Sequence, residues 1–181
     1  EPDQSHYLKN VMRCKINEKI LVFDNCTGEY TAEIMHVHKR SIDIEVLEKT
    51  KPRYVPRDVW LIFCPLKKTR TDFLIEKSTE IGLRKFLPTF SNKTQTKIIS
   101  LNRSRRNIVE AVEQCRGTFI PEILPISSLA DVIAELPEER ILIFCDESLE
   151  SRNISECLLL ERPAKVAILV GPEGGFSDSE R

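Results

Sequence analysis

The first fifty residues carry short runs of apolar and polar positions rather than long periodic stretches. After a short helical stretch at 6–12, residues 20–23, 30–37 and 42–46 have the length and pattern of β-strands. Residues 24–28, Asp-Asn-Cys-Thr-Gly, have the composition of a tight turn. Short strands joined by tight turns, with no long helix among them, predict a small β-barrel.

From residue 59 onward, continuous apolar runs alternate with amphipathic stretches. Such runs predict strands that are covered on both faces, as in a parallel sheet, and helical spacing predicts the crossovers between them. The alternation therefore predicts an α/β domain with a parallel sheet. The predicted strands are 59–64, 86–87 (ending before Pro88), 141–145 and 166–170, and the predicted helices are 72–81 and 102–115.

The segment at 49–56, Lys-Thr-Lys-Pro-Arg-Tyr-Val-Pro, has the composition of a linker, with two prolines and three basic residues. It separates the β-rich pattern from the alternating one. We therefore expect one domain at residues 1–55 and a second at 56–181.

The most distinctive segment runs from 167 to 177, Ala-Ile-Leu-Val-Gly-Pro-Glu-Gly-Gly-Phe-Ser, where a buried strand leads into a glycine-rich loop. In open α/β sheets, ligands bind beyond the carboxyl ends of the strands, and glycines let the backbone approach a ligand closely. The spacing matches neither common phosphate-binding glycine motif. An adenosine attached to a small charged group fits this loop, and a bare strand-to-helix turn is the alternative. Ser177 and Glu180 then form an S-x-x-E helix-start signal.

Charge is distributed unevenly along the chain. Residues 1–120 hold 22 Lys and Arg against 15 Asp and Glu, whereas residues 121–181 hold 5 against 13. The first two-thirds of the chain therefore predict a surface for a polyanion such as nucleic acid, with an ordinary charge-mixed surface as the alternative.

Other features of the composition exclude several classes of protein. No apolar run is long enough to cross a bilayer, and the first residues do not resemble a signal peptide, so we expect a cytoplasmic protein with no membrane contact. The six cysteines lack metal-ligand spacing and are expected to be buried free thiols. His36 and His38 lie on one face of a strand without a third ligand, so no metal site is predicted.

Four segments together resemble the RsmE family of the SPOUT methyltransferase superfamily. They are His-Tyr-Leu-Lys-Asn-Val-Met-Arg at 6–13, Lys-Ser-Thr-Glu-Ile-Gly at 77–82, Glu-Gln-Cys at 113–115 with Ile-Pro-Glu-Ile at 120–123, and Gly-Pro-Glu-Gly-Gly-Phe-Ser at 171–177.

This resemblance implies a PUA-like β-barrel followed by an α/β domain with a C-terminal trefoil knot, an exception to unknotted topology. It also implies a homodimer that methylates N3 of one uridine in small-subunit ribosomal RNA, with S-adenosylmethionine as the donor. A Leu-Gly-x-x-Ile-Leu-Arg-x-Glu-Thr-like segment, which completes the knot and the cofactor pocket in the family, does not occur here. We therefore expect the 56–181 domain to be incomplete at its C-terminal end.

The resemblance also assigns roles to individual residues. Lys93 stands where the family has arginine in a Glu-Arg-Ser-like segment, and it is the candidate positive partner for the negative charge that develops on the uracil ring. A plain phosphate contact is the alternative for Lys93. The candidate cofactor-binding residues are Val170, Gly171, Glu173, Gly174, Gly175, Asp146 and Glu147. Capping of the next helix is an equal alternative for Glu173, and an ordinary solvated loop is the favoured alternative for Asp146 and Glu147. The candidate RNA-backbone contacts are Arg13, Lys67, Lys68, Arg70, Arg103, Arg105 and Arg106.

Two other functions compete with this one. A SPOUT enzyme could act on another RNA, for example on a transfer RNA ribose, although the N-terminal barrel segment argues against that target. A non-catalytic RNA-binding protein would use the glycine loop only as a turn.

Overall fold

The computed structural model describes residues 2–146, 153–161 and 163–181. Its chain forms two compact units, Glu1–Val55 and Pro56–Arg181, each with a sheet of its own. Within the described ranges, no helix combines the length and the apolar character that crossing a bilayer demands.

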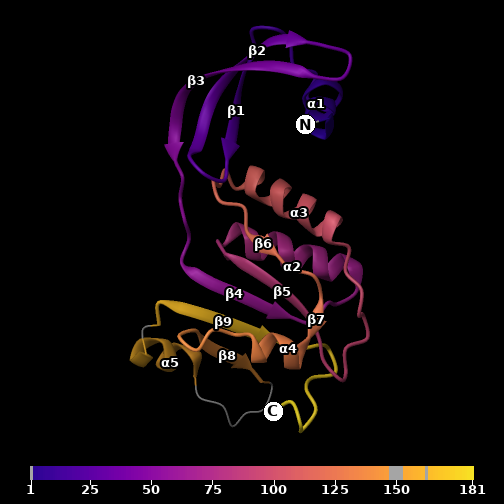
Figure 1. Ribbon diagram of the computed structural model, residues 1–181, viewed down its shortest axis with the longest axis vertical. Coiled ribbons are helices and arrows are strands. Elements are labelled where there is room, and N and C mark those ends of the chain that lie inside the picture. The colour runs from indigo at the N-terminus through magenta and orange to yellow at the C-terminus, as the bar shows by residue number, and fades with distance from the viewer. Residues whose placement is uncertain (1, 147–152, 162) are drawn as a thin grey trace. The chain divides into compact units, whose positions relative to one another are not determined.

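The first unit is a three-stranded antiparallel sheet in which β2 lies between β1 and β3. Ala32 and Ile34 on the central strand are fully buried, which places the small core of this unit along β2. A helical segment precedes the sheet along the chain, as the sequence predicts (Figure 1). The elements are α1 (Pro2–His6), a π-helical turn η1 (Tyr7–Val11), β1 (Lys19–Asp24), β2 (Gly28–Val37) and β3 (Ile42–Pro52).

The predicted turn at 24–28 is confirmed. The Asp24 carboxylate accepts hydrogen bonds from the backbone N–H groups of Cys26 and Gly28, at 2.9 and 3.2 Å. These bonds, with those from Thr27, hold the pKa of Asp24 well below its ordinary value. Gly28 has φ +131°, and a Cβ there would lie 2.8 Å from the backbone nitrogen of Arg53, so this position requires glycine.

The second unit is built on a sheet whose main strands run in the order β6-β5-β4-β9-β8, all parallel. The arrows of β4, β5, β8 and β9 point the same way in Figure 1, so their carboxyl ends share one edge. The short strand β7 pairs separately with the end of β5. The strands are β4 (Asp58–Phe63), β5 (Lys85–Phe90), β6 (Glu122–Ile123), β7 (Ser127–Ser128), β8 (Ile141–Cys145) and β9 (Lys165–Val170).

The strand order reverses between β4 and β9. From β4 the chain proceeds outward to β5 and β6, and it later returns from β8 to β9 on the other side of β4. Open α/β sheets bind ligands outside the carboxyl ends of the strands at such a reversal. The segments that follow β4 and β9 therefore lie where a ligand is expected.

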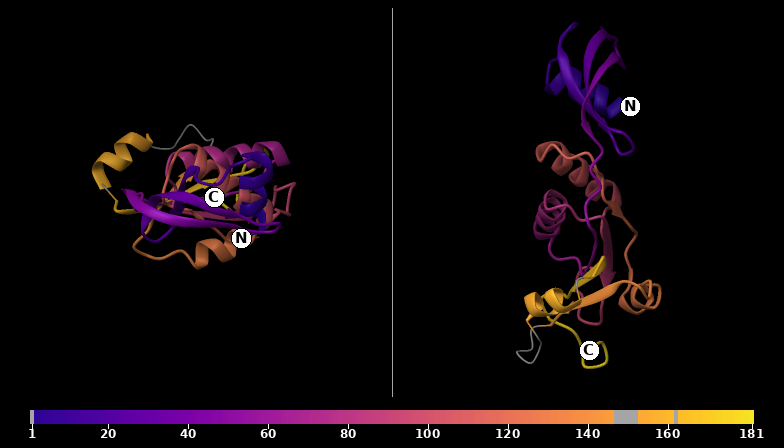
Figure 2. Two further views of the ribbon diagram at one scale, coloured as in Figure 1. Left: turned by 90° about the horizontal axis from the view of Figure 1, so that it is seen from above. Right: turned by 90° about the vertical axis from the view of Figure 1, so that its left-hand side faces the viewer.

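Helices cover both faces of this sheet. In the right-hand view of Figure 2, α2 and α5 lie on one side of the strands and α4 lies on the other. Leu129 and Val132 of α4 pack in a core cluster with Ile62, Leu87 and Leu169. The helices are α2 (Lys68–Glu80), α3 (Leu101–Gln114), α4 (Leu129–Ala134) and α5 (Ile154–Glu161).

Some expectations about the elements were wrong. The strand expected to end before Pro88 continues to Phe90, and Pro88 is fully buried within it. On the side of β5 that faces away from β4, β6 pairs only as far as Phe86 and β7 only from Thr89. Proline is tolerated at Pro88 because neither strand requires a backbone hydrogen bond from that position. The helices α4 and α5 and the strands β6 and β7 were not predicted, since each is short and weakly patterned.

Two expectations about burial also need correction. The run at 141–145 was expected to be a buried strand, but β8 ends the strand path, and its Ile141 and Cys145 are exposed. The five cysteines whose side chains the structure describes are free thiols, yet only two of these are buried, because the other three lie in turns or at the ends of elements. Cys14 and Cys64 are the buried ones, and Cys26, Cys115 and Cys145 are exposed.

Candidate functional site

The glycine loop leaves the sheet at the point where the strand order reverses. Val170, the last residue of β9, pairs with Phe63 of β4 on one side and with Cys145 of β8 on the other. The backbone N–H of Cys64 donates a 3.2 Å hydrogen bond to the Val170 carbonyl. The loop therefore begins between the ends of two parallel strands, where a ligand is expected in this class of fold.

The loop is a tight turn in which each glycine meets a local steric demand. Gly175 has φ +65°, and its N–H donates a 2.9 Å hydrogen bond to the Pro172 carbonyl. A Cβ at Gly171 would overlap the ring of Phe176, and a Cβ at Gly174 would lie 3.4 Å from the Cβ of Lys93. Gly171 thus leaves room for the Phe176 ring, whereas Gly174 lies at an ordinary contact distance from Lys93.

Phe176 fixes the base of the loop. Its ring is almost completely buried and meets Phe144 of β8 edge to face, with the ring centroids 4.8 Å apart. It belongs to the core cluster that contains Leu169 and Leu129. The loop is therefore anchored in the core just behind its exposed tip at Glu173.

Lys93 lies against the glycine loop, although 78 residues separate it in sequence from Gly171. Its Nζ donates a hydrogen bond of 3.0 Å to the Phe176 carbonyl, and its side chain borders Gly174. The structure thus places the candidate positive group beside the candidate cofactor loop, at the carboxyl edge of the sheet.

A second set of contacts links the segment after β5 to the segment after the loop. The backbone N–H of Asn92 donates to Glu180 at 2.8 Å, and its side-chain amide donates to the Ser177 hydroxyl at 3.0 Å. Glu180 also accepts from the Ser177 N–H at 2.9 Å, which is one half of the predicted capping box. Burial alone would raise the pKa of Glu180, but these hydrogen bonds and the charge of Lys93 outweigh it and lower the pKa.

Asp146 directly follows β8 and is partly buried at the same edge. It forms an ion pair with Arg181, in which Nη2 and Oδ1 lie 3.2 Å apart. This contact joins the end of β8 to the segment that follows the glycine loop. Glu147, the other acidic residue expected here, lies outside the described residues.

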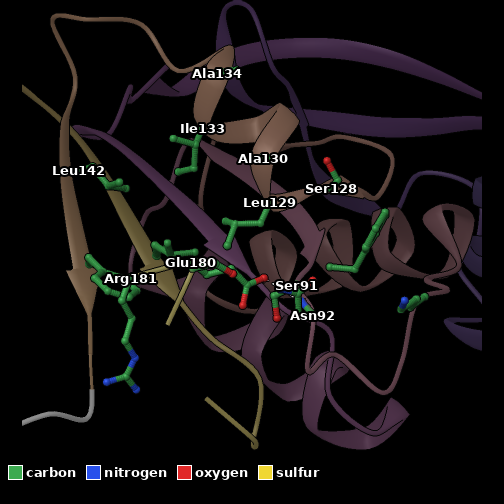
Figure 3. Close-up of a pocket in the computed structure, with 15 residues that line it drawn as sticks. Ser91, Asn92, Ser128, Leu129, Ala130, Ile133, Ala134, Leu142, Glu180 and Arg181 are labelled. Carbon is green, nitrogen blue, oxygen red and sulfur yellow. Dashed lines mark hydrogen bonds between the residues drawn. The ribbon is translucent and has the colours of Figure 1, made fainter. Parts of the chain in front are cut away.

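An open cavity of about 700 Å³ lies next to these contacts, a volume within the usual range for small-molecule sites. Figure 3 shows α4, β8 and the segment around Ser91 and Glu180 surrounding it. Apolar side chains form much of its wall, and polar groups converge from the loops. The lining residues are Phe90, Ser91, Asn92, Lys97, Ser128, Leu129, Ala130, Ile133, Ala134, Leu142, Phe144, Leu169, Ser179, Glu180 and Arg181.

The cavity and the predicted cofactor residues are adjacent but not identical. The cavity lining includes neither the glycine-loop residues nor Asp146. Arg181 lines the cavity and forms the ion pair with Asp146. Sequence reasoning missed the contribution of Leu129 and Ile133, because α4 was not predicted. The S128-x-x-D131 pattern was the available signal, since the Asp131 N–H donates to the Ser128 hydroxyl as in a helix cap.

The basic residues expected to contact RNA differ in whether they already have a partner in the protein. Lys67, Lys68, Arg105 and Arg106 are exposed. Arg70 instead pairs with Glu173 at the tip of the glycine loop. Arg13 lies in the first unit, exposed and with φ +55°.

Arg103 holds α3 against α2 through Asp72. Its Nε donates to both carboxylate oxygens of Asp72, at 3.0 and 3.1 Å. This hydrogen bonding raises the pKa of the Arg103 guanidinium. Arg103 is therefore committed to an ion pair within the protein, which the sequence did not predict.

Comparison with known families accounts for this arrangement. A model of the RNA methyltransferase domain matches residues 53–181, and a model of the RNA methyltransferase PUA domain matches residues 1–47. The chain belongs to the RsmE family of RNA methyltransferases.

Similar proteins match nearly the whole chain of this RsmE-family member. Ribosomal RNA small subunit methyltransferase E of Rickettsia conorii is 26% identical over 179 residues, which cover 97% of this chain and 71% of that protein. The same-named protein of Buchnera aphidicola from Schizaphis graminum is 29% identical over 189 residues, covering 96% and 72%.

Two solved structures share the fold of this RsmE-family member. Ribosomal RNA small subunit methyltransferase E from Neisseria gonorrhoeae, bound to S-adenosyl methionine, superposes with a TM-score of 0.86 at 27% identity and covers 99% of this chain and 76% of that one. A putative methyltransferase from Legionella pneumophila, in complex with the same cofactor, gives a TM-score of 0.89 at 26% identity with the same coverage.

Proposed function

We propose that this protein methylates N3 of a uridine in small-subunit ribosomal RNA, in the cytoplasm, with S-adenosylmethionine as the methyl donor. The observation that carries the proposal is the glycine loop at the reversal of strand order, beside an open cavity, in a chain of the RsmE family. Relatives that bear the name ribosomal RNA small subunit methyltransferase E, and two related structures that hold the cofactor, support the choice of substrate and donor.

The cavity has the chemistry that an adenosine-bearing cofactor needs. Leu129, Phe144 and Leu169 supply apolar surface for a base, while Ser91 and Glu180 supply hydrogen-bonding groups. We assign the cofactor to this cavity and to the residues beside it, Val170, Gly171, Glu173, Gly174, Gly175 and Asp146. When bound, the cofactor supplies an activated methyl group on a sulfonium.

The protein's own contribution is mainly to position the acceptor and to stabilise charge. Uridine N3 loses its proton as it accepts the methyl group, so negative charge develops on the ring. Lys93 is a fixed cation beside the glycine loop, and we propose that it stabilises this charge.

The exposed basic residues are proposed to hold the RNA backbone. Such contacts supply affinity and position rather than sequence reading. In the second unit these are Lys67, Lys68, Arg70, Arg105 and Arg106, and in the first unit Arg13, within the PUA-like unit at residues 1–55. Arg103 was expected among them, but Asp72 holds its guanidinium.

The remaining family features are proposed for the same reasons. We propose the SPOUT-type parallel-sheet fold for the 56–181 domain, in which the segment that closes the trefoil knot of the family does not occur, and a homodimer as the working form. The apolar side chains that α2 leaves exposed, Phe73 and Ile81, are candidates for the subunit interface.

Two experiments test the proposed function. Isothermal titration calorimetry with S-adenosylmethionine separates an enzyme from a non-catalytic RNA-binding protein, and the absence of binding would refute the proposal. Mass spectrometry of ribosomal RNA from a strain that lacks the gene should show loss of N3-methyluridine, which returns when the gene is restored. An unchanged level of N3-methyluridine would show that the enzyme acts on another target.

A further inference from the structure

The glycine loop is tied at its tip to the start of α2 by one ion pair. Arg70, in the first turn of α2, binds the carboxylate of Glu173 through Nη1. The two residues belong to the segments that follow β4 and β9, the strands between which the sheet order reverses. This contact therefore bridges the two sides of the candidate cofactor site.

The base and the tip of the loop are held differently. At the base, Phe176 is buried and its carbonyl accepts from Lys93, so that part is fixed by the core. At the tip, Glu173 and Arg70 are both substantially exposed, with 49% and 66% of their side chains accessible. An ion pair this exposed is weak and open to competition from another anion.

The surroundings of Arg70 attract anions. The first turn of α2 contains no acidic residue, and the exposed Lys67 and Lys68 precede Arg70. Among the described residues, no carboxylate pairs with either lysine. A nucleic-acid phosphate that reaches this turn meets three basic side chains, and the Arg70 guanidinium can bind it with two parallel hydrogen bonds.

We propose that Arg70 is a positioning residue that couples RNA binding to cofactor binding, because an RNA phosphate and Glu173 compete for its guanidinium. This inference rests on the proposed function. In the absence of RNA, Arg70 neutralises Glu173. When a phosphate takes Arg70, the Glu173 carboxylate is released beside the cofactor site, where it attracts the cationic sulfonium and ammonium groups of S-adenosylmethionine.

The coupling must be reciprocal, because each ligand changes the other's affinity by the same factor. The Arg70–Glu173 contact is an exposed ion pair, so its loss changes the affinity for S-adenosylmethionine by roughly two- to fivefold. The effect should shrink at high salt, where exposed ion pairs and phosphate contacts are both screened.

The test is calorimetric titration of S-adenosylmethionine into the protein, with and without a saturating short oligouridylate, at low salt. The wild-type Kd for the cofactor should fall by about two- to fivefold when RNA is present. Arg70→Gln should have the lower Kd already without RNA and show no further change. Arg70→Lys, which keeps the charge but loses the planar fork, should show an intermediate response.

Lys68→Gln is the matched control, because it removes a neighbouring positive charge that does not contact Glu173. It should need more RNA for saturation, yet show the wild-type shift in cofactor Kd once saturated. Failure of the wild-type protein to bind S-adenosylmethionine would refute the proposed function itself. Three results would overturn the coupling alone. They are cofactor binding that RNA does not strengthen, an oligouridylate that does not bind, and a full shift in cofactor Kd that is retained in Arg70→Gln.

Discussion

The Lys93 ammonium donates a hydrogen bond of 3.0 Å to the carbonyl of Phe176. This bond joins the segment after β5 to the base of the glycine loop. It places a positive charge at the carboxyl edge of the sheet, where the ends of β4 and β9 lie together. The same side chain borders Gly174, where an added Cβ would lie at an ordinary contact distance of 3.4 Å from the Lys93 Cβ.

The role of Lys93 can be tested by removing its charge. Lys93→Met should lower kcat for methyl transfer by roughly 100-fold, because a positioned group that stabilises developing charge contributes on this scale. The Kd for S-adenosylmethionine, measured by calorimetry, should change far less than kcat. Lys93→Arg keeps the charge and should recover part of the rate. A Lys93→Met enzyme with the wild-type kcat would show that Lys93 only supports the loop.

The contact between Gly171 and Phe176 predicts a steric effect on stability. In Gly171→Ala, the new Cβ would lie 2.7 Å from Cζ of the buried ring, so either the ring or the loop must move. Overpacking of this kind costs about 1–3 kcal/mol in the free energy of unfolding, which urea denaturation can measure.

Two further variants separate steric overlap from a general effect of the loop. Gly174→Ala is the matched control, since its Cβ would meet Lys93 at an ordinary 3.4 Å and should cost much less. Phe176→Leu in the Gly171→Ala background should make the two substitutions less than additive, because the smaller side chain leaves room. Fully additive losses would contradict the proposed overlap.

The hydrogen bonds to Glu180 predict a dependence of stability on pH. Its pKa is below the ordinary value of 4.5 in the folded protein, despite the opposing effect of burial. Its contribution is therefore complete above pH 4.5 and is lost as the pH falls through the lower, folded-state pKa.

Thermal unfolding between pH 7 and pH 3 measures this contribution. Glu180→Gln should be less stable than the wild type near neutral pH, and the two unfolding temperatures should converge in acid. Asp178→Asn changes an exposed carboxylate of the same segment and should follow the wild-type curve. A constant difference between Glu180→Gln and the wild type at every pH would refute the ionic role of Glu180.

A cluster at the opposite edge of the sheet predicts a large effect on folding. The Arg140 side chain is buried, and its guanidinium carbon lies 3.6 Å from the ring centroid of Trp60. Its nitrogens donate to the Asp58 carboxylate and to the carbonyls of Asp58 and Val166, each at 3.0 Å. Arg140 directly precedes β8, and its side chain links the first residues of β4 to β9.

Arg140→Met removes this buried cation, so that two carbonyls lose its donors and Asp58 keeps the more distant Arg84, 3.7 Å away. The free energy of unfolding should fall by about 3 kcal/mol. Urea denaturation followed by the fluorescence of Trp60, the only tryptophan of the chain, reports on the affected site directly. Lys165→Ala breaks a neighbouring but exposed ion pair with Glu139 and should cost at most about 1 kcal/mol. Equal losses in the two variants would refute the role of burial.

By itself, the sequence determined the features that depend on neighbouring residues. Continuous apolar runs indicated β4, β8 and β9, and helical periodicity indicated α2 and α3, because burial on both faces or on one face leaves a pattern along the chain. The turn at 24–28 and the half capping box of Ser177 and Glu180 also follow from local hydrogen bonding. The glycine loop indicated the edge of the sheet that carries the site, and the four motif segments together indicated the family.

Only the tertiary structure decided which distant side chains meet. Lys93 and Phe176 are 83 residues apart and Arg70 and Glu173 are 103 apart, and no local pattern records such pairs. Pro88 remains in β5 because of where β6 and β7 pair, and the cavity wall depends on the short helix α4. The ring of Phe176, five residues along the chain, lies against Gly171, a contact that the motif does not record. Local chemistry restricts what each segment can form, whereas packing between segments selects the contacts that build the site.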